Sequence, residues 1–364
     1  MTSEAQGRLT DVRAAMAAQE LEALLVDEPG NRRWLTGFTG SAGTVIVSAD
    51  DAWLHTDSRY YEQVERQSPE FELVRAGTAP LESLCALLED NSLKRVGIEA
   101  ETVTVGRLER MRSQAPDIDW VSTSGIVERF RAIKTEAEID AIARCAALGD
   151  DVMRLAYDLA RPGMTESELG WQLEKYMREH GAQGLAFPTI VGAGPNGALP
   201  HHATGDRPIG VGEPIVIDLG AAMGGYNGDL TRTFSLGPAS DPDYEAVWSI
   251  VAEANQAAAN GIRPGVTGAE ADALARDVIT AAGYGEAFGH GLGHGVGINV
   301  HEMPRLGPAA SDAPLREGMV LTIEPGIYLP GRFGVRIEDL AVLRADGVEI
   351  LSRVEKTPVV ETAP

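Results

Sequence analysis

The second half of the chain repeats its own pattern, and this repeat constrains the possible folds more than any other feature. The turn Arg161–Thr165 follows one long helix-like stretch and precedes another, and Arg263–Thr267 does the same further along. The helix after each turn is expected to end at a glycine, Gly181 in one case and Gly283 in the other. Features repeated in the same order indicate an internal duplication. We therefore expect two halves that face each other across a pseudo-two-fold axis.

Each half also carries a strand that ends on an acid. Gly212–Asp218 and Gly318–Glu324 both run from a glycine through apolar residues to a carboxylate. A turn and a second strand follow, with a further acid in each half, Asp229 and Glu338. The first half alone is compatible with turn-capping aspartates or with a metal site. Carboxylates at matching places in facing halves favour the metal site, because divalent cations would cancel their repulsion.

Histidines gather in the second half, between its helices and its strands. The stretch Gly289–Gly297 alternates glycine with other residues, and glycine lets a backbone pass close to a bound group. His290, His294 and His301 lie in it or just after it, although the whole chain has only 7 histidines. A ligand set of carboxylates and imidazole without thiolate favours two divalent ions, Mn²⁺ or Co²⁺ before Zn²⁺.

The rest of the chain is long enough for a separate domain. A length of 364 residues suggests about two domains. Residues 1–130 alternate helix-like and strand-like segments, which predicts an α/β domain, and Trp34–Gly43 is expected to be a loop within it. Thr135 and Glu138 form a capping-box pattern at the start of a long amphipathic helix. Residues 131–364 are therefore expected to form a second domain, of the α+β class.

The composition excludes some partners and indicates a compartment. A net charge of −23 argues against nucleic acid or an anionic membrane as a partner, because phosphates need a basic surface. The 2 cysteines, Cys85 and Cys145, lie far apart and show no paired spacing, which predicts reduced thiols and a cytoplasmic protein. No apolar run reaches the roughly 18 residues that a membrane span needs.

Five motifs of the second domain, taken together, resemble the Xaa-Pro peptidases. These enzymes, aminopeptidase P and prolidase, belong to the pita-bread metallopeptidase family M24. The five motifs are Ile217–Gly220, Gly228–Phe234, Gly291–Gly297, Thr322–Tyr328 and Gly334–Asp339. In the first domain, Leu35–Thr44 and Leu54–Tyr61 resemble the creatinase-like N-terminal domain of the same family. The resemblance covers essentially the whole chain and implies a pita-bread fold for the second domain.

The resemblance implies a role for each acid. Asp218 would bind one metal ion, and His294 and Glu324 would bind the other. Asp229 and Glu338 would bridge the two ions. Glu324 would also carry a proton from the attacking water to the leaving proline nitrogen. All five positions hold the residue type that the family has there.

The resemblance also implies roles for residues around the metal ligands. His201 and His301 would hydrogen-bond the substrate or the tetrahedral intermediate, and His290 would help to form the proline pocket. Arg336 would orient a metal-binding aspartate, and Tyr328 would line the pocket. The residues around the ligands would then serve substrate binding.

The expected activity is hydrolysis of the bond between an N-terminal residue and a following proline in a peptide. The motifs of the first domain favour aminopeptidase P over a strict Xaa-Pro dipeptidase, which differs only in whether longer peptides fit. A metal-free, creatinase-like amidinohydrolase is a more distant alternative, and so is a non-enzymatic binding protein on the same fold. Both conflict with a full set of metal ligands. The family further implies a homodimer or a larger homo-oligomer.

Overall fold

The computed structural model describes residues 4–361 and divides the chain into two compact units. The first unit is Met1–Arg131 and the second is Ala132–Pro364. The division lies one residue beyond the boundary expected from the sequence. We describe each unit by itself.

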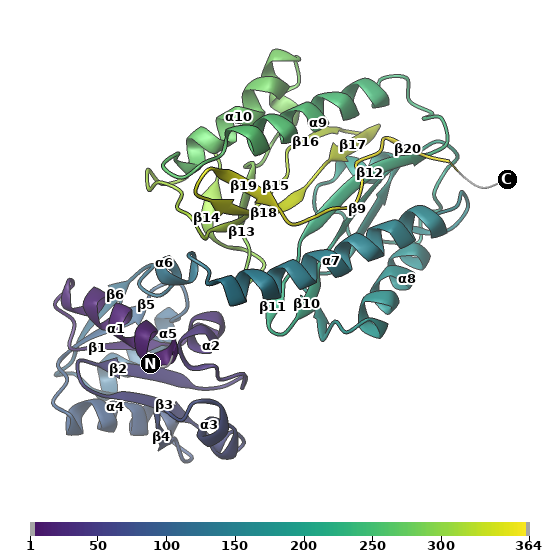
Figure 1. Cartoon of the computed structure of the whole chain (residues 1–364). Coiled ribbons are helices and arrows are strands. Elements are labelled where there is room, and N and C mark those ends of the chain that lie inside the picture. Colours follow the sequence, from purple (N-terminus) through teal and green to yellow (C-terminus); the bar gives the residue numbers. More distant parts are fainter. Residues whose placement is uncertain (1–3, 362–364) are drawn as a thin grey trace. The chain divides into compact units, whose positions relative to one another are not determined.

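The first unit is built on a six-stranded mixed sheet with strand order β4-β3-β2-β1-β5-β6. Its central strand β1 pairs antiparallel with β2 and parallel with β5. Buried apolar residues of α4 and α5 pack against one face of this sheet, so the predicted α/β class is confirmed (Figure 1). The strands are β1 (Ala23–Val26), β2 (Thr44–Ser48), β3 (Ala52–Thr56), β4 (Glu72–Arg75), β5 (Arg95–Glu99) and β6 (Asp119–Thr123). The helices are α1 (Glu4–Ala17), α2 (Pro29–Thr36), α3 (Tyr61–Gln67), α4 (Pro80–Asp90), α5 (Val105–Gln114) and α6 (Glu128–Arg131).

The stretch Trp34–Gly43, expected to be a loop, is partly helical. Helix α2 occupies its first three residues and ends where Gly37 adopts a left-handed φ of 75°. Proline stands in the first turn of this helix, and the Glu28 carboxylate accepts a hydrogen bond from the Asn31 amide. These two signals at the start of the helix outweigh the glycine and threonine content further along.

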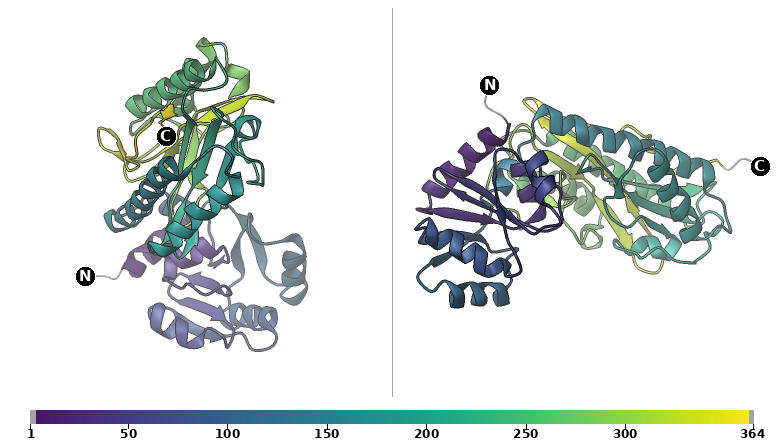
Figure 2. Two further views of the ribbon diagram at one scale, coloured as in Figure 1. Left: turned by 90° about the vertical axis from the view of Figure 1, so that its right-hand side faces the viewer. Right: turned by 90° about the horizontal axis from the view of Figure 1, so that it is seen from below.

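The second unit contains two helix pairs with strands between them. Figures 1 and 2 show α7 with α8 on one side of the strands and α9 with α10 on the other. The helices are α7 (Glu136–Leu159), α8 (Glu166–Glu179), α9 (Tyr244–Gly261) and α10 (Gly268–Ala281), with short 3₁₀ turns η1 (Gly194–Ala198) and η2 (Gly285–Ala287). The first-half strands are β7 (Gly184–Leu185), β8 (Ile190–Ala193), β9 (Pro214–Leu219), β10 (Ala221–Met223), β11 (Tyr226–Asn227) and β12 (Leu230–Leu236). The later strands are β13 (Gly293–Gly295), β14 (Glu302–Leu306), β15 (Val320–Ile323), β16 (Gly326–Leu329), β17 (Phe333–Arg336), β18 (Asp339–Arg344), β19 (Gly347–Ile350) and β20 (Val359–Val360).

The internal repeat predicted from the sequence is present in this unit. Helices α8 and α10 begin with the same capping box, in which Thr165 and Thr267 exchange hydrogen bonds with the glutamate three residues later. The two threonines also form matching antiparallel bridges, with Pro208 in the first half and with Pro314 in the second. A four-stranded sheet β20-β12-β9-β8 serves the first half, and a five-stranded sheet β14-β13-β15-β18-β19 serves the second. The α+β class with a duplicated half is thus confirmed.

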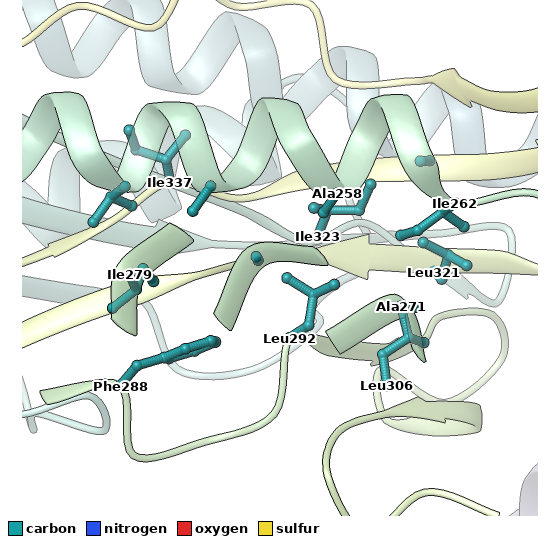
Figure 3. Close-up of a cluster of buried hydrophobic side chains, with 14 of the residues drawn as sticks. Ala258, Ile262, Ala271, Ile279, Phe288, Leu292, Leu306, Leu321, Ile323 and Ile337 are labelled. Carbon is teal, nitrogen blue, oxygen red and sulfur yellow. The ribbon is translucent and has the colours of Figure 1, made fainter. Parts of the chain in front are cut away.

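Each half has its own hydrophobic core. In the second half, Ala258 and Ile262 of α9 pack above Leu321 and Ile323 of β15 (Figure 3). In the first half, residues of α7 and α8 pack in the same way against β9 and β12. Full burial of one leucine or isoleucine contributes about 1.5–3 kcal/mol, so these cores stabilise the strands that carry the acids.

No helix within residues 4–361 is both long enough and apolar enough to cross a membrane.

Candidate metal centre

The four predicted acids all lie at the ends of paired strands. Asp218 is near the end of β9 and Asp229 directly precedes β12, the strand paired with β9. In the second half, Glu324 directly follows β15 and Glu338 directly precedes β18, its antiparallel partner. Local strand pairing therefore brings the two acids of each half to the same end of their hairpin.

Tertiary packing then brings the two hairpins together. One ligand atom from each of Asp229, His294 and Glu338 can be chosen so that all three lie within 4.8 Å of one another. The Nε2 atom of His294 lies 3.7 Å from Asp229 Oδ2 and 3.3 Å from Glu324 Oε1. The side chain of Asp218 is 13% exposed and that of Glu324 17%, so every acid of the cluster is largely buried.

The electrostatics of this cluster call for additional positive charge. Burial and the neighbouring carboxylates raise the pKa values of Asp229 and Glu338 well above their ordinary range. Burial also raises the pKa of Asp218, although the Arg336 guanidinium opposes the shift. Among the described residues, nothing donates a hydrogen bond to the buried Oδ1 atom of Asp218. Divalent cations would neutralise the carboxylates and satisfy this atom, so the residues fit such ions.

His294 is oriented towards the acids by its backbone surroundings. Its Nδ1 atom lies 3.1 Å from the Gly295 carbonyl oxygen, which can only accept, so Nδ1 carries a proton and Nε2 faces the carboxylates. Burial opposes protonation of this ring, but Glu324 outweighs that effect and raises the pKa of His294. A metal ion would take the place of the Nε2 proton.

The glycines beside His294 are required by close backbone approach. A Cβ atom at Gly293 would lie 2.2 Å from the Thr322 carbonyl oxygen, and one at Gly295 would lie 2.1 Å from that of Met303. Strand β13 is therefore packed tightly between β15 and β14. This packing fixes the position of the His294 backbone, and with it the point from which the imidazole extends. The two glycines of the Gly-His-Gly pattern are thus explained by the close approach of the neighbouring strands.

A chain of buried hydrogen bonds supports Asp218. Arg336 donates from Nη2 to Asp218 Oδ2 at 2.5 Å, and from Nη1 to the Tyr328 hydroxyl at 3.0 Å. Because the guanidinium can only donate, the Tyr328 hydroxyl proton is free to point at His290 Nε2, 2.8 Å away. The other nitrogen of His290 lies 2.7 Å from the Gly291 carbonyl oxygen, and burial lowers the pKa of this ring. Both nitrogens of neutral His290 are thus engaged within the protein.

The other two predicted histidines are exposed at the site. The rings of His301 and His294 lie edge to face with their centroids 4.3 Å apart. Burial and then the charge of His294 lower the pKa of His301, and the charge of His201 adds to the shift. His201 follows Pro200, whose carbonyl oxygen lies 3.4 Å from Arg336 Nη1. The structure therefore places the His301 ring against the His294 ring, and the backbone that precedes His201 against Arg336.

Two threonines that the sequence analysis did not select hold the carboxylates in place. The Thr231 hydroxyl donates to Glu338 Oε2 at 2.8 Å, and the Thr322 hydroxyl donates to Glu324 Oε1 at 3.1 Å. Thr322 also accepts from the His294 amide at 3.0 Å. Thr322 stands two residues before the acid it bonds, and side chains two apart on a strand share a face, whereas Thr231 bonds an acid of the other half. For Thr322, this spacing was the available signal.

Comparison with known proteins shows the same division of the chain. A model of the metallopeptidase family M24 matches residues 140–345, and a model of the creatinase/prolidase N-terminal domain matches residues 8–133. An Xaa-Pro dipeptidase of Pyrococcus horikoshii is 34% identical over 346 residues, which is 94% of this chain and 95% of that protein.

Solved structures of similar proteins cover nearly the whole chain. An Xaa-Pro dipeptidase from Bacillus anthracis is 36% identical, with a TM-score of 0.94 over 98% of this chain and 99% of that one. An X-Pro aminopeptidase from Thermotoga maritima is 36% identical, with a TM-score of 0.86 over 96% of this chain and 100% of that one. The similarity therefore extends across both units.

Proposed function

This chain belongs to metallopeptidase family M24, and we propose that it hydrolyses Xaa-Pro dipeptides to release proline. It is a peptidase with a creatinase-like α/β N-terminal domain and a pita-bread catalytic domain, as expected from the sequence. The first-domain motifs favour aminopeptidase P, but we now propose the Xaa-Pro dipeptidase activity instead. Relatives named Xaa-Pro dipeptidase match this chain along nearly its full length, and they favour the dipeptide as substrate.

The observation that carries the proposal is the convergence of buried carboxylates and one imidazole from two facing hairpins. We propose that His294 and Glu324 hold one divalent ion, that Asp218 holds a second, and that Asp229 and Glu338 are shared. Oxygen-rich ligands with one nitrogen favour Mn²⁺, with Co²⁺ or Zn²⁺ as substitutes. Such ions would polarise the scissile carbonyl and lower the pKa of a bound water.

The protein's own residues would then move protons and bind the substrate. Glu324, whose Oε1 atom accepts a hydrogen bond from the Thr322 hydroxyl, would act as the base. It takes a proton from the attacking water and returns it to the proline nitrogen as the C–N bond breaks. His201 and His301 would donate hydrogen bonds to the carbonyl oxygen, which gains negative charge as water adds.

The buried residues behind the ligands would orient them. Arg336 holds Asp218, and Tyr328 links Arg336 to His290. Because both nitrogens of His290 are engaged, we propose that this residue positions Tyr328 and presents a ring face to the proline, without exchanging a proton. Assembly as a homodimer or larger oligomer, and a cytoplasmic location, stay predictions.

A substrate-length series on the Mn²⁺-loaded protein tests the proposal. We expect rapid hydrolysis of a dipeptide Xaa-Pro, and much slower hydrolysis of Xaa-Pro-Xaa and Xaa-Ala peptides. Efficient cleavage of the tripeptide would return the assignment to aminopeptidase P. Equal cleavage of Xaa-Ala would remove the proline requirement.

Metal removal is the matching control. Treatment with a chelator is expected to abolish dipeptide hydrolysis, and added Mn²⁺ is expected to restore it. Full activity of a protein shown by elemental analysis to hold no metal would favour the creatinase-like alternative. Binding of Xaa-Pro dipeptides by the metal-loaded protein, with no turnover, would favour the binding-protein alternative.

A further inference from the structure

The segment that carries His201 is held on both sides of that residue. On one side, the Pro200 carbonyl oxygen accepts a hydrogen bond from Arg336, the residue that also binds Asp218. On the other side, the ring of His202 is bonded through Nε2 to a carboxylate oxygen of Glu166 at 2.8 Å. The exposed side chain of His201 therefore projects from a backbone whose two neighbouring residues are both tethered.

Glu166 is the centre of the second tether. It is the first residue of α8 and its side chain is fully buried, with 0% exposure. Its Oε1 atom accepts hydrogen bonds from the Ala193 amide and from Asn196 Nδ2, both at 2.9 Å. Its Oε2 atom meets His202, whose side chain is 11% exposed. One carboxylate thus binds both ends of the stretch from Ala193 to His202.

The chemistry of this group fixes the direction of the contact with His202. A buried carboxylate only accepts hydrogen bonds, so His202 Nε2 must carry a proton and donate it. A charge-assisted bond of this kind is shorter and stronger than a neutral one. Leaving a buried carboxylate without such donors would be costly, so the three donors are needed together.

The second half of the second unit shows that the fold does not require the Glu166 carboxylate. Gly268 is the first residue of α10, in the place that Glu166 has in α8. A Cβ atom at Gly268 would lie 2.1 Å from the Arg305 carbonyl oxygen, so no side chain can occupy that place. The same helix start and the same threonine bridge form there without a glutamate. The role of Glu166 is therefore specific to the half that carries His201.

We propose that Glu166 and His202 are positioning residues that hold the side chain of His201 in its productive direction. The proposal rests on the proposed function, in which His201 donates a hydrogen bond to the substrate carbonyl oxygen. Neither positioning residue contacts the substrate itself. They act by fixing the backbone on the side of His201 that Arg336 does not hold. A displacement of about 1 Å at a catalytic group can cost roughly 100-fold in rate.

The test is a double-mutant cycle with the variants His202→Ala and His201→Ala in the Mn²⁺-loaded full chain. We expect His202→Ala to lower kcat for an Xaa-Pro dipeptide by about 10-fold or more with little change in KM, because orientation matters in the transition state. In the His201→Ala background, the same change should cost almost nothing further. His202→Gln, which keeps an N–H donor, should recover most of the activity.

Two matched controls separate positioning from general damage. His180→Ala removes an exposed histidine from the other end of α8 and should leave kcat unchanged. Glu168→Gln alters the same first helical turn as Glu166→Gln but does not touch the loop, so only Glu166→Gln should lower kcat. Metal content and the melting temperature are measured for every variant. If Glu166→Gln fails to fold, the His202 variants still carry the test.

The outcomes distinguish failure of this inference from failure of the proposed function. Additive losses in the cycle, or a His202→Ala variant with wild-type kcat, would overturn the positioning role. A His201→Ala variant with wild-type kcat would instead refute the part given to His201 in the proposed function. Absence of dipeptide hydrolysis by the wild-type protein would refute the proposed function as a whole.

Discussion

The two halves of the second unit share a scaffold but carry different candidate ligands. Both start their second helix with the same capping box, and both bring two acids to the same end of a pair of antiparallel strands. The first half contributes the aspartates Asp218 and Asp229. The second contributes the glutamates Glu324 and Glu338, together with the histidine His294. The scaffold is common to the two halves, whereas the candidate ligand types differ between them.

The register of the strands shows where His294 has its counterpart. In the first half Ala193 of β8 pairs with Ile215, and in the second half Gly295 of β13 pairs with Leu321. Ile215 and Leu321 stand at the same distance before the acid that ends each strand. Ala193 and Gly295 are therefore equivalent, and so are the residues before them.

The residue equivalent to His294 is Gly192, where a side chain would be crowded by the backbone of the following turn. A Cβ atom there would lie 3.1 Å from the Asn196 carbonyl oxygen and 3.2 Å from the Cα atom of Gly197. These atoms belong to η1, which leads into the segment that carries His201. One half therefore has the candidate ligand His294 where the other has a glycine packed against η1. Symmetry of the backbone does not imply symmetry of the ligands.

The second acids of the two hairpins are also not strictly equivalent. Asp229 and Glu338 both directly precede a strand, which agrees with the sequence expectation. In the pairing register, however, Asp218 lies opposite Thr231, whereas Ile323 lies opposite Asp339. Asp229 is thus two residues further towards its turn. Since side chains two apart share a face of a strand, both acids still point to the same side.

The largest expected effect comes from removing one shared acid in either half. Asp229→Ala and Glu338→Ala should each abolish metal loading and lower kcat/KM by well over the roughly 10- to 100-fold typical of residues that only support a ligand. Metal content and dipeptide hydrolysis measure the effect, and the exposed acid Asp158 supplies the control variant Asp158→Ala. If only one variant lost metal, the equal sharing of the site between the halves would be wrong.

Removal of His294 should affect the two proposed metal ions unequally. His294→Ala deletes the nitrogen ligand of the second half and leaves every carboxylate, so we expect one ion to bind much more weakly and the other to stay. Calorimetric titration of the metal-free protein with Mn²⁺ should then show one tight site in place of two. Equal loss of both ions would mean that the two sites form a single unit.

Arg336 links the two halves, since it belongs to the second half and donates a hydrogen bond to Asp218 of the first. A variant of Arg336 tests whether this link matters for activity. Arg336→Lys keeps the charge but loses the planar fork that reaches Asp218 and Tyr328 together. We expect kcat to fall about 10- to 100-fold. The control is Arg332→Lys, because Arg332 pairs with Asp241 near the protein surface. An unchanged kcat in Arg336→Lys would show that the halves need no such link.

The smallest effects should come from the features that the halves share. Thr165→Ala and Thr267→Ala each remove an N-cap, and each should cost about 1 kcal/mol in the free energy of unfolding. Chemical denaturation measures both. Clearly unequal costs would show that the two capping boxes are not equivalent in energy.

The cost of Thr267→Ala, in the second half, should also depend on pH. The amide and hydroxyl of Thr267 hold the pKa of Glu270 below its ordinary value of 4.5. Because the folded-state pKa is lowered, the stabilisation is fully present above the ordinary value of 4.5 and is lost as the pH falls through the folded-state pKa. The cost of Thr267→Ala should therefore shrink in acid. A cost that grew on acidification would contradict this assignment.

Part of the fold and of the site follows from local sequence order. The capping boxes, the apolar strands and the acids at their ends depend on residues close together in the chain, so periodicity and spacing reveal them. The glycine and threonine content of Trp34–Gly43 predicts a loop, whereas the start signals of α2, Glu28 and Pro29, stand before that stretch.

By itself, the sequence determined that the chain has a duplicated unit whose strands end in acids, because each of those features is set within a few residues. Only the tertiary structure decided that Glu166 reaches His202, that Arg336 of one half holds Asp218 of the other, and that His290 has no free nitrogen. The physical reason is that a buried hydrogen bond depends on the positions of two atoms from distant segments. No residue pattern encodes that distance, whereas packing of the two halves fixes it.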